Sequence, residues 1–475
     1  MAGRLPRFAG ARGVLEANDM EVSMNTIVLA VLIMTGLSLL RVPVVIALVI
    51  SALVGGLHAG MPVNDIIAAF NGGLGSGAVV ALASATLGAF AVALSRTGIA
   101  DLVAARILRL IGAGEDATRM KYVKWGIYGA LVVIGFSADT IVPIHIAFIP
   151  MLIPPLLGLM NMMKLDRRII ACVLTFSIVI PYMITPVGFG AIFLNDILTQ
   201  NVNEAGAGLG LEVSYGMAPK AMLIPALGMV AGLLVAVFFS YRKPRDYHQV
   251  EYHQPVMGGN DEQQHTAGSL SGLQIAVLAA AVVGALTVQV LTGSMVLGGL
   301  LGFSLLSING LFRWKEQDDV FTQGMRLMAF IGFVMIAASG FAGVMKATGT
   351  IPELVAGASS LIGDSPSMAA LMMLLVGLFI TMGIGSSFST VPIIAAIFVP
   401  MALSFGFSPM ATIALVGTAG ALGDAGSPAS DSTLGPTAGL NVDGQHDHIR
   451  DSVIPTFIHY NIPLILFGWI AAQVL

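Results

Sequence analysis

The segment "GDAGSPASDST", residues 423–433, places two aspartates, three serines and a threonine in eleven positions of a chain that is 56% hydrophobic. An apolar run, residues 411–422, precedes it, and "LGPTAGL" follows it. Irregular polar backbone at membrane depth is tolerated only where it is buried in protein or lines a wet cavity. The segment therefore predicts a broken membrane helix, in which residues 411–422 form the first half and residues 423–433 are unwound.

The composition places the whole chain in a membrane. Of its 475 residues only 10% are charged, and the mean hydropathy is +0.89. Many apolar runs reach the length that crosses roughly 30 Å of hydrocarbon. The 56 glycines and 22 prolines indicate closely packed and interrupted helices. We therefore predict an all-α, multi-pass protein of the plasma (inner) membrane.

Three stretches of the first half of the chain recur in the second half in the same order. Their sequences are "FNGGLGSGAVV", "SADTIVPIHIAFIPM" and "TPVGFG", matched by "FTQGMRLMAFI", "SSFSTVPIIAAIFVPM" and "SPASDS". The matched pairs begin at Phe70 and Phe321, at Ser137 and Ser386, and at Thr185 and Ser427. Such internal repetition predicts two membrane repeats of about five transmembrane helices each.

The repeats divide the chain into four parts. The first repeat is residues 24–240 and the second is residues 271–475, and a polar cytoplasmic linker, residues 241–270, joins them. The polar, arginine-containing residues 1–23 do not resemble a signal peptide. We interpret them as a disordered arm or as the result of a mis-assigned start.

Basic residues set the expected orientation. Lysines and arginines crowd residues 96–124 and 164–168, on both sides of a short apolar pair with the tip "SADT". Because basic residues favour the cytoplasmic side, both ends of the pair are expected there. Its first limb, residues 122–136, spans roughly 22 Å as a helix, which favours a re-entrant hairpin over two ordinary spans. The second repeat is then inverted, with an opposed hairpin tip at "GSSFST", and the C-terminus lies outside.

The hairpin tips and the breaks carry the polar side chains that could bind an ion or a solute. Half-helix ends expose carbonyl or amide groups, and an aspartate inside a membrane usually marks an ion path or a buried pair. In the second break the candidates are Asp424, Ser427, Ser430, Asp431, Ser432 and Thr433. In the first break they are Thr185, Gly188 and Gly190. At the two tips they are Ser137, Asp139, Thr140, Ser386, Ser387, Ser389 and Thr390.

Each ionisable candidate has an alternative interpretation. Asp431, inside the Ser/Thr cluster, is the stronger candidate for binding Na+, and Asp424 could instead cap a half-helix. Asp139 could also contribute to a Na+ site, or lie near the membrane surface if its hairpin is shallow. His145 could relay a proton or pack as an ordinary core histidine.

At these residues the chain resembles a known family. "SPASDSTLGP" is similar to the Ser-Pro-x-Ser-Asp-Thr-Thr signature of the NhaC-type Na+/H+ antiporter family, and "IVPIHIAFIPMLIPPLLG" and "GQHDHIRDSVIPTFIHYNIP" resemble a branch labelled as antiporters or as histidine and amino acid transporters. Both belong to the ion transporter superfamily. The resemblance implies two inverted repeats with opposed hairpins, a homodimer, and an elevator-like transport domain that moves against a scaffold. Ser432 departs from the pattern, which usually has threonine there, and leaves the transported species open.

These patterns favour a secondary active transporter that couples Na+ to the movement of a proton or another solute. The alternative is a Na+-coupled symporter of an amino acid, such as histidine, or of a carboxylate. An ion channel is disfavoured, because paired hairpins and broken helices imply occlusion. The polar membrane residues carry no nucleotide-binding, zinc-protease or nucleophile-elbow pattern, so we expect no enzyme activity, no cofactor other than a coupling ion and no nucleic acid partner.

Overall fold

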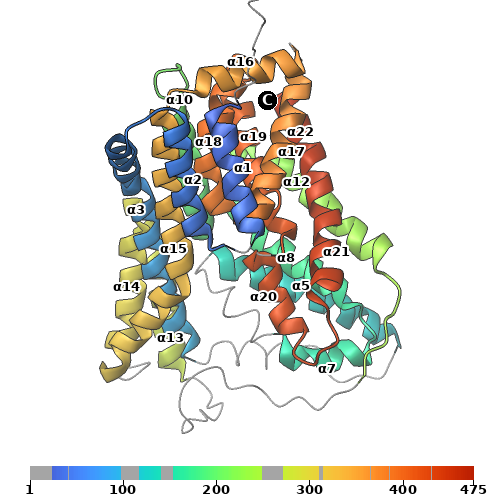
Figure 1. Cartoon of the computed structure of the whole chain (residues 1–475). Coiled ribbons are helices and arrows are strands. Elements are labelled where there is room, and N and C mark those ends of the chain that lie inside the picture. The colour runs from blue at the N-terminus through green and yellow to red at the C-terminus, as the bar shows by residue number, and fades with distance from the viewer. Residues whose placement is uncertain are drawn as a thin grey trace, which may run out of the picture.

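A computed structural model describes residues 24–40, 42–97, 117–140, 153–248, 271–309, 314–363, 365–384, 386–428 and 430–475. Within these ranges every regular element is a helix, which confirms the all-helical architecture predicted from composition. The helices form an elongated bundle (Figure 1). The expected N-terminal arm, most of the linker, and His145 lie outside the described residues, as does the side chain of Asp139.

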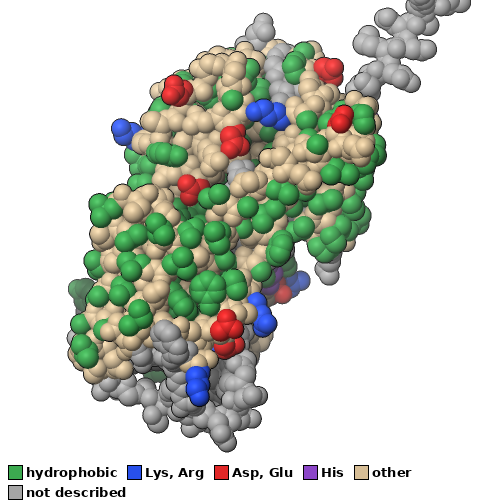
Figure 2. Space-filling view, turned by 90° about the vertical axis from the view of Figure 1, so that its left-hand side faces the viewer, with side chains coloured by type: hydrophobic (Ala, Val, Ile, Leu, Met, Phe, Trp, Pro, Cys, Tyr) green, Lys and Arg blue, Asp and Glu red, His purple; other side chains and the backbone are tan. Residues whose placement is uncertain are grey.

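Several helices match the dimensions of a bilayer. Six of those in the described ranges are long and apolar enough to cross a membrane, and six more are apolar but shorter. Figure 2 shows one face on which hydrophobic side chains are widespread, whereas charged side chains are few and stand mostly toward the two ends. The six long segments are Gly77–Leu94, Arg167–Ile184, Leu223–Ser240, Gly272–Thr292, Ser387–Ser404 and His448–Val474.

One side of the bundle is built on two long helices, α3 (Val63–Ser95) and α15 (Gln317–Ala347), which lie side by side (Figure 1). They run antiparallel and approach closely at glycines. A Cβ atom on Gly73 would lie 2.4 Å from the carbonyl oxygen of Ser339, and one on Gly324 would lie 2.2 Å from Cα of Ala89. Helices α2 (Val44–His58) and α14 (Met295–Ile308) and the short η3 (Trp314–Glu316) contact this pair. Beyond them, α13 (Gly272–Thr292) packs on α14, α1 (Thr26–Leu39) packs on α2, and α16 (Ile351–Ile362) packs on α1 and α18.

The other side of the bundle holds the shorter and interrupted helices (Figure 1). From the first half of the chain they are α5 (Ala117–Thr140), α7 (Pro154–Met162), α8 (Arg167–Ile184), α9 (Phe189–Ala191), η1 (Ile192–Thr199), α10 (Gln200–Gly206), α11 (Met217–Ala221), α12 (Leu223–Val235) and η2 (Ala236–Ser240). From the second half they are α17 (Pro366–Ile384), α18 (Ser387–Ser404), α19 (Pro409–Ala421), η4 (Asp424–Gly426), α20 (Asp431–Leu440), η5 (His448–Val453), α21 (Ile454–Thr456), η6 (Phe457–Asn461) and α22 (Ile462–Val474).

Both segments expected to interrupt a helix do so. After α8, Thr185 is extended because it precedes a proline, and Gly188 has a φ of 64° before helix resumes at Phe189. After α19, Gly423 has a φ of 81°, and regular α-helix resumes only at α20. The unwound part of this second break ends at residue 430, three residues earlier than expected. The reason is that the Ser430 hydroxyl accepts a hydrogen bond from the backbone N–H of Ser432 at 3.1 Å and caps α20.

The two expected hairpins also have helical limbs. The sequence predicts the first limb over residues 122–136, but α5 has 24 residues, because the polar residues before the limb and the tip residues 137–140 are helical as well. In the second pair, α17 and α18 meet at Ser386, which is extended. That these pairs are re-entrant, and that the two halves have inverted topology, remain predictions.

Candidate functional site

The carboxylate of Asp424 lies in the second break among hydroxyl groups. It is buried, with 4% of the residue exposed, in the short 3-10 turn η4. Its oxygens accept hydrogen bonds from the hydroxyls of Ser430 at 2.5 Å, Tyr182 at 2.6 Å and Ser387 at 2.9 Å. These donors come from three segments: the break itself, the end of α8 and the start of α18.

Close backbone packing brings Asp424 to this position. The N–H of Gly423 donates to Oδ1 of Asn461 at 2.9 Å, and a Cβ atom on Gly423 would lie 2.7 Å from the backbone nitrogen of Met382. A Cβ atom on Gly426 would lie 2.6 Å from Cα of Phe457. Only glycine allows the turn at Gly423 without strain, and it lets the break lie against α17 and η6.

The other hydroxyls of the break hold its backbone. Ser432 Oγ donates to the carbonyl of Asp424 at 2.6 Å, and Thr433 Oγ1 donates to the carbonyls of Ser427 at 2.6 Å and Ser430 at 2.9 Å. The Thr175 hydroxyl of α8 donates to the carbonyl of Ser432 at 2.8 Å. These hydrogen bonds satisfy backbone carbonyls inside the break, so its backbone conformation is held by side chains.

Asp431 lies beside this cluster and less deeply. It is the first residue of α20, half-buried, with its Oδ1 3.5 Å from the Ser430 hydroxyl. A carboxylate in the first turn of a helix interacts favourably with the helix dipole. Of the two aspartates that the sequence singled out, Asp424 is therefore the more deeply buried.

A profile of a known protein family matches the sequence of this chain across the second break. A family profile described as "Na+/H+ antiporter family" matches residues 173–469, which include both aspartates, and a second, described as "Na+-H+ antiporter family", matches residues 25–111. The chain belongs to the Na+/H+ antiporter family. Its members include secondary transporters, and this chain is a multi-pass membrane transporter of that kind.

Relatives of this antiporter-family chain cover nearly its whole length. An uncharacterized membrane protein of Vibrio parahaemolyticus is 56% identical over 95% of this chain and 100% of its own. YuiF of Bacillus subtilis, whose name describes it as a candidate amino acid transporter, is 49% identical over 95% of this chain and 100% of its own.

Two solved transporters share the fold. The YdaH transporter of Alcanivorax borkumensis aligns with a TM-score of 0.55 at 14% identity, over 86% of each chain. MtrF of Neisseria gonorrhoeae, described as illuminating a class of antimetabolite efflux pumps, aligns with a TM-score of 0.52 at 16% identity, over 86% of this chain and 83% of its own. At these identities the likeness shows the fold alone.

The first break of the antiporter-family chain meets the first hairpin tip by packing. A Cβ atom on Gly188 would lie 1.7 Å from the carbonyl oxygen of Thr140, and one on Gly190 would lie 2.0 Å from that of Thr185. The carbonyl of Gly188 accepts a hydrogen bond from Nε2 of Gln289 at 3.4 Å. These predicted residues are therefore brought together, with both glycines required for close approach.

The remaining predicted residues divide between the two tips. Ser387 reaches Asp424, whereas Thr390 donates to the carbonyl of Ser386 at 2.8 Å within its own helix. Ser389 is buried in the same first turn of α18, and Ser137 is half-buried in α5. Only one of these hydroxyls is thus shown in contact with a carboxylate.

Two residues of the site were missed by the sequence reasoning, Tyr182 and Asn461. Tyr182 lies three residues before Thr185, in "PYMITPVGFG", and it is buried near the end of α8. A buried tyrosine hydroxyl usually has a hydrogen-bond partner, so its position was a usable signal. Asn461, near the end of the chain, gave no comparable signal.

The donors around Asp424 are suited to a small, hard cation. No group of three or more histidine, cysteine, aspartate or glutamate side chains in the described ranges could hold a multivalent metal ion. Around Asp424 there is one central carboxylate with hydroxyl and carbonyl oxygens, which are the ligands that hard cations prefer. Unwound helices in transporters present such oxygens to Na+ or H+.

A second polar cluster lies where α8 begins. The side chain of Arg167 is fully buried and donates to both carboxylate oxygens of Asp443, at 2.6 and 2.5 Å. It also donates to the carbonyl of Leu440 at 2.7 Å and lies over the ring of Tyr247 at 4.3 Å. This arginine joins α8 to the end of α20, at the far end of α20 from Asp424.

Proposed function

We propose that the Asp424 carboxylate binds the coupling cation, Na+ or H+, of a secondary active transporter. The observation that carries the proposal is the convergence of three hydroxyls from separate segments on one buried carboxylate in an interrupted helix. A structural ion pair would place a basic side chain there, whereas the donors to this carboxylate within the described ranges are hydroxyls.

The chemistry of hydroxyls supports exchange of the two cations. Each hydroxyl has one proton to donate and two lone pairs to offer, so the same three groups can donate to a bare carboxylate or turn their oxygens toward Na+. A buried carboxylate without a compensating charge is costly, so it is favourable either to bind Na+ or to take up a proton. The two cations therefore compete for Asp424, and binding one releases the other.

Asp431 is proposed as a secondary carboxylate of the same site. It is separated from Asp424 by the hydroxyl of Ser430, which contacts both side chains. Because Asp431 is more exposed than Asp424, we propose that a cation meets Asp431 first on its way from solvent to the buried carboxylate. Asp431 therefore raises the local concentration of cations, with a weaker effect on binding than Asp424.

Alternating access follows from the proposed inverted repeats. The matched stretches that begin at Phe70 and Phe321 lie in α3 and α15, and these helices run antiparallel, as equivalent helices of inverted repeats do. Ala81 and Gly332 are equivalent at the offset of these stretches, and a Cβ atom on Gly332 would lie 3.1 Å from Cβ of Ala81. We further propose an elevator-like motion against this pair, within a homodimer of the inner membrane.

The orientation in the membrane follows the basic residues. Arg242, Lys243 and Arg245 open the linker, next to Arg167 and Arg168 of α8. This cluster favours the cytoplasmic side, and the C-terminus then lies outside.

Cation-coupled amino acid transport is the second candidate function. It is favoured by the name of YuiF, which aligns over 95% of this chain and over the whole of its own length. Na+ at Asp424 would then drive solute uptake in place of proton exchange.

Proteoliposomes that enclose a pH-sensitive dye test the first candidate. Addition of Na+ to vesicles with an imposed proton gradient should dissipate that gradient in the wild type and, more slowly, in Asp431→Asn. Asp424→Asn keeps the side-chain shape and should give no Na+-dependent signal. Normal Na+-dependent proton flux in Asp424→Asn would contradict the proposal.

A further inference from the structure

A pocket of about 610 Å³ lies between the two sides of the bundle. Its walls come from α3 and α15 on one side and from α10 and α18 on the other, and include Gly72, Gly75, Glu204, Lys346, Pro392 and Ala396. Figure 1 shows these four helices near one another in the upper part of the bundle. The volume falls in the range of pockets for small molecules, which is larger than a bare cation needs.

The pocket exists because α3 lacks side chains where it faces the space. A Cβ atom on Gly72 or Gly75 would meet no atom within 4 Å, whereas one on the intervening Gly73 would meet α15. Glycine inside a helix costs about 1 kcal/mol relative to alanine. Helix packing accounts for Gly73 but not for Gly72 or Gly75, so the open space is the feature that these two glycines preserve.

Two opposite charges stand at this pocket. The ammonium of Lys346 donates to the backbone carbonyl of Glu204 at 3.2 Å, while the Glu204 carboxylate accepts from Nε2 of Gln200 at 2.9 Å. Both side chains are exposed. A molecule that carries both an ammonium and a carboxylate could therefore pair with both.

We propose that this pocket binds a small zwitterionic solute of the α-amino acid class. The solute's ammonium pairs with Glu204 and its carboxylate pairs with Lys346. The side chain of the solute occupies the space beside Gly72 and Gly75. The solute site is separate from the cation site, and only its coupling to Na+ rests on the proposed function.

Helix α18 connects the solute pocket to Asp424. Phe388, Pro392 and Ala396 are four residues apart and follow one face of the helix. Pro392 and Ala396 line the pocket, and the residue before Phe388 is Ser387, which donates to Asp424. Ser387 and Pro392 are about 8 Å apart along the helix axis. A solute that contacts α18 is therefore in position to influence the hydroxyl of Ser387.

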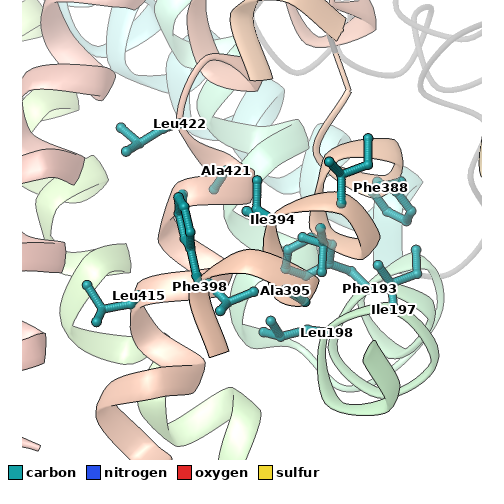
Figure 3. Close-up of a cluster of buried hydrophobic side chains, with 14 of the residues drawn as sticks. Phe193, Ile197, Leu198, Phe388, Ile394, Ala395, Phe398, Leu415, Ala421 and Leu422 are labelled. Atoms are coloured by element: carbon teal, nitrogen blue, oxygen red, sulfur yellow. The ribbon is translucent and has the colours of Figure 1, made fainter. Parts of the chain in front are cut away.

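Aromatic rings form a second connection. The ring of Phe388 lies 4.3 Å from that of Phe189 and 5.5 Å from those of Phe193 and Tyr182, and Tyr182 donates to Asp424. Figure 3 shows Phe388 of α18 close to Phe193 of η1. If a bound solute displaces Phe388, the side chains of Tyr182 and Ser387 would shift with it.

Binding to purified protein in detergent tests the proposal. The probes are the twenty radiolabelled L-amino acids, each in NaCl, and any that binds is then challenged with its N-acetyl and its amide derivatives. We expect at least one to bind the wild type and both derivatives to compete at least 10-fold more weakly, because each lacks one charge. Gly75→Leu should weaken binding at least 10-fold by filling the space. Gly126→Leu is the matched control, since its added side chain would begin where no atom lies within 4 Å and outside this pocket.

Binding of ²²Na+ to the same samples separates this proposal from the cation site. Gly75→Leu should retain ²²Na+ binding, because it leaves Asp424 and its hydroxyls unchanged. The proposal is overturned if no amino acid binds the wild type, if the derivatives compete as well as the parent, or if Gly75→Leu binds normally. If the Gly75→Leu protein cannot be produced, amino acid binding is measured on Glu204→Gln instead. Undiminished amino acid binding by Glu204→Gln overturns the proposal. If the wild type itself binds no ²²Na+, the proposed cation site at Asp424 is overturned instead.

Discussion

The hydroxyl of Tyr182 lies 2.6 Å from Oδ2 of Asp424, although 242 positions separate the two residues in sequence. Tyr182 lies in the last turn of α8, before the first break, and Asp424 lies in the second break. The interrupted helices of the two halves therefore meet at a single carboxylate. A cation bound there would contact both halves of the chain.

Removal of that hydroxyl should weaken cation binding. The Tyr182 hydroxyl favours the charged form of Asp424, and a hydrogen bond to a charged group contributes about 1.5–3 kcal/mol. Tyr182→Phe should therefore favour the protonated form and lower the apparent Na+ affinity roughly 10-fold or more. Tyr128→Phe is the matched control, because the Tyr128 hydroxyl is buried and no partner for it is found in the described ranges. Na+ titrations of transport should shift for Tyr182→Phe alone. Equal affinities in the two variants would remove Tyr182 from the site.

The buried arginine at the start of α8 should matter for stability. Arg167→Leu leaves Asp443 buried without its partner, and loss of one member of a buried pair costs about 3–5 kcal/mol. Combining it with Asp443→Leu should recover much of the loss. Asp246→Ala breaks the exposed pair with Lys164 and should cost less than about 1 kcal/mol. Thermal unfolding in detergent measures all four proteins, and an Arg167→Leu protein as stable as Asp246→Ala would refute this role.

Alanine substitutions at two adjacent glycines of α3 should have different effects on the stability of the protein. Gly73→Ala places a methyl group against the carbonyl of Ser339 and should destabilise the protein by about 1–3 kcal/mol, since overpacking forces the two helices apart. Gly72→Ala meets open space and should be neutral or stabilising by up to about 1 kcal/mol. Melting temperatures compare the two variants, and the same change for both would show that α3 and α15 are not closely packed.

Stability should also fall in mild acid, in part because of His446. Burial lowers the pKa of His446 from 6.5 to about 4, and its Nε2 lies 2.8 Å from the Ser452 hydroxyl. Between these pH values the unfolded chain binds a proton that the folded chain does not, so the free energy of unfolding decreases as the pH falls. His446→Gln should flatten the fall in melting temperature from pH 7 to pH 5. A fall as steep as that of the wild type would mean that His446 is protonated in the folded protein.

Local composition was enough to predict the helical class and the two breaks. Glycine, proline and polar residues inside apolar runs, such as Gly423 and Gly188, have backbone requirements that do not depend on distant partners. The cap of α20 was less predictable, because Ser430 is one of three serines that could have started the helix. In the structure Ser430 has the extended backbone of a helix cap, and its side chain accepts from the N–H of Ser432.

The ranking of the two aspartates could not be derived from the sequence. Asp431 has hydroxyl residues on both sides, whereas the donors to Asp424 include Tyr182 and Ser387, which are far away in the chain. Which carboxylate lies deeper depends on the turn at Gly423 and on its bond to Asn461. These are tertiary contacts, and no spacing in a single sequence indicates them.

Equilibrium binding of ²²Na+ to purified protein, measured as a function of pH, tests the central claim most directly. The wild type should bind Na+ in competition with protons, so that affinity falls as the pH is lowered. Asp424→Asn should bind no Na+ at any pH, and Asp431→Asn should bind with a modest loss of affinity. Undiminished, pH-dependent binding by Asp424→Asn, together with its loss in Asp431→Asn, would contradict the claim and place the cation at Asp431.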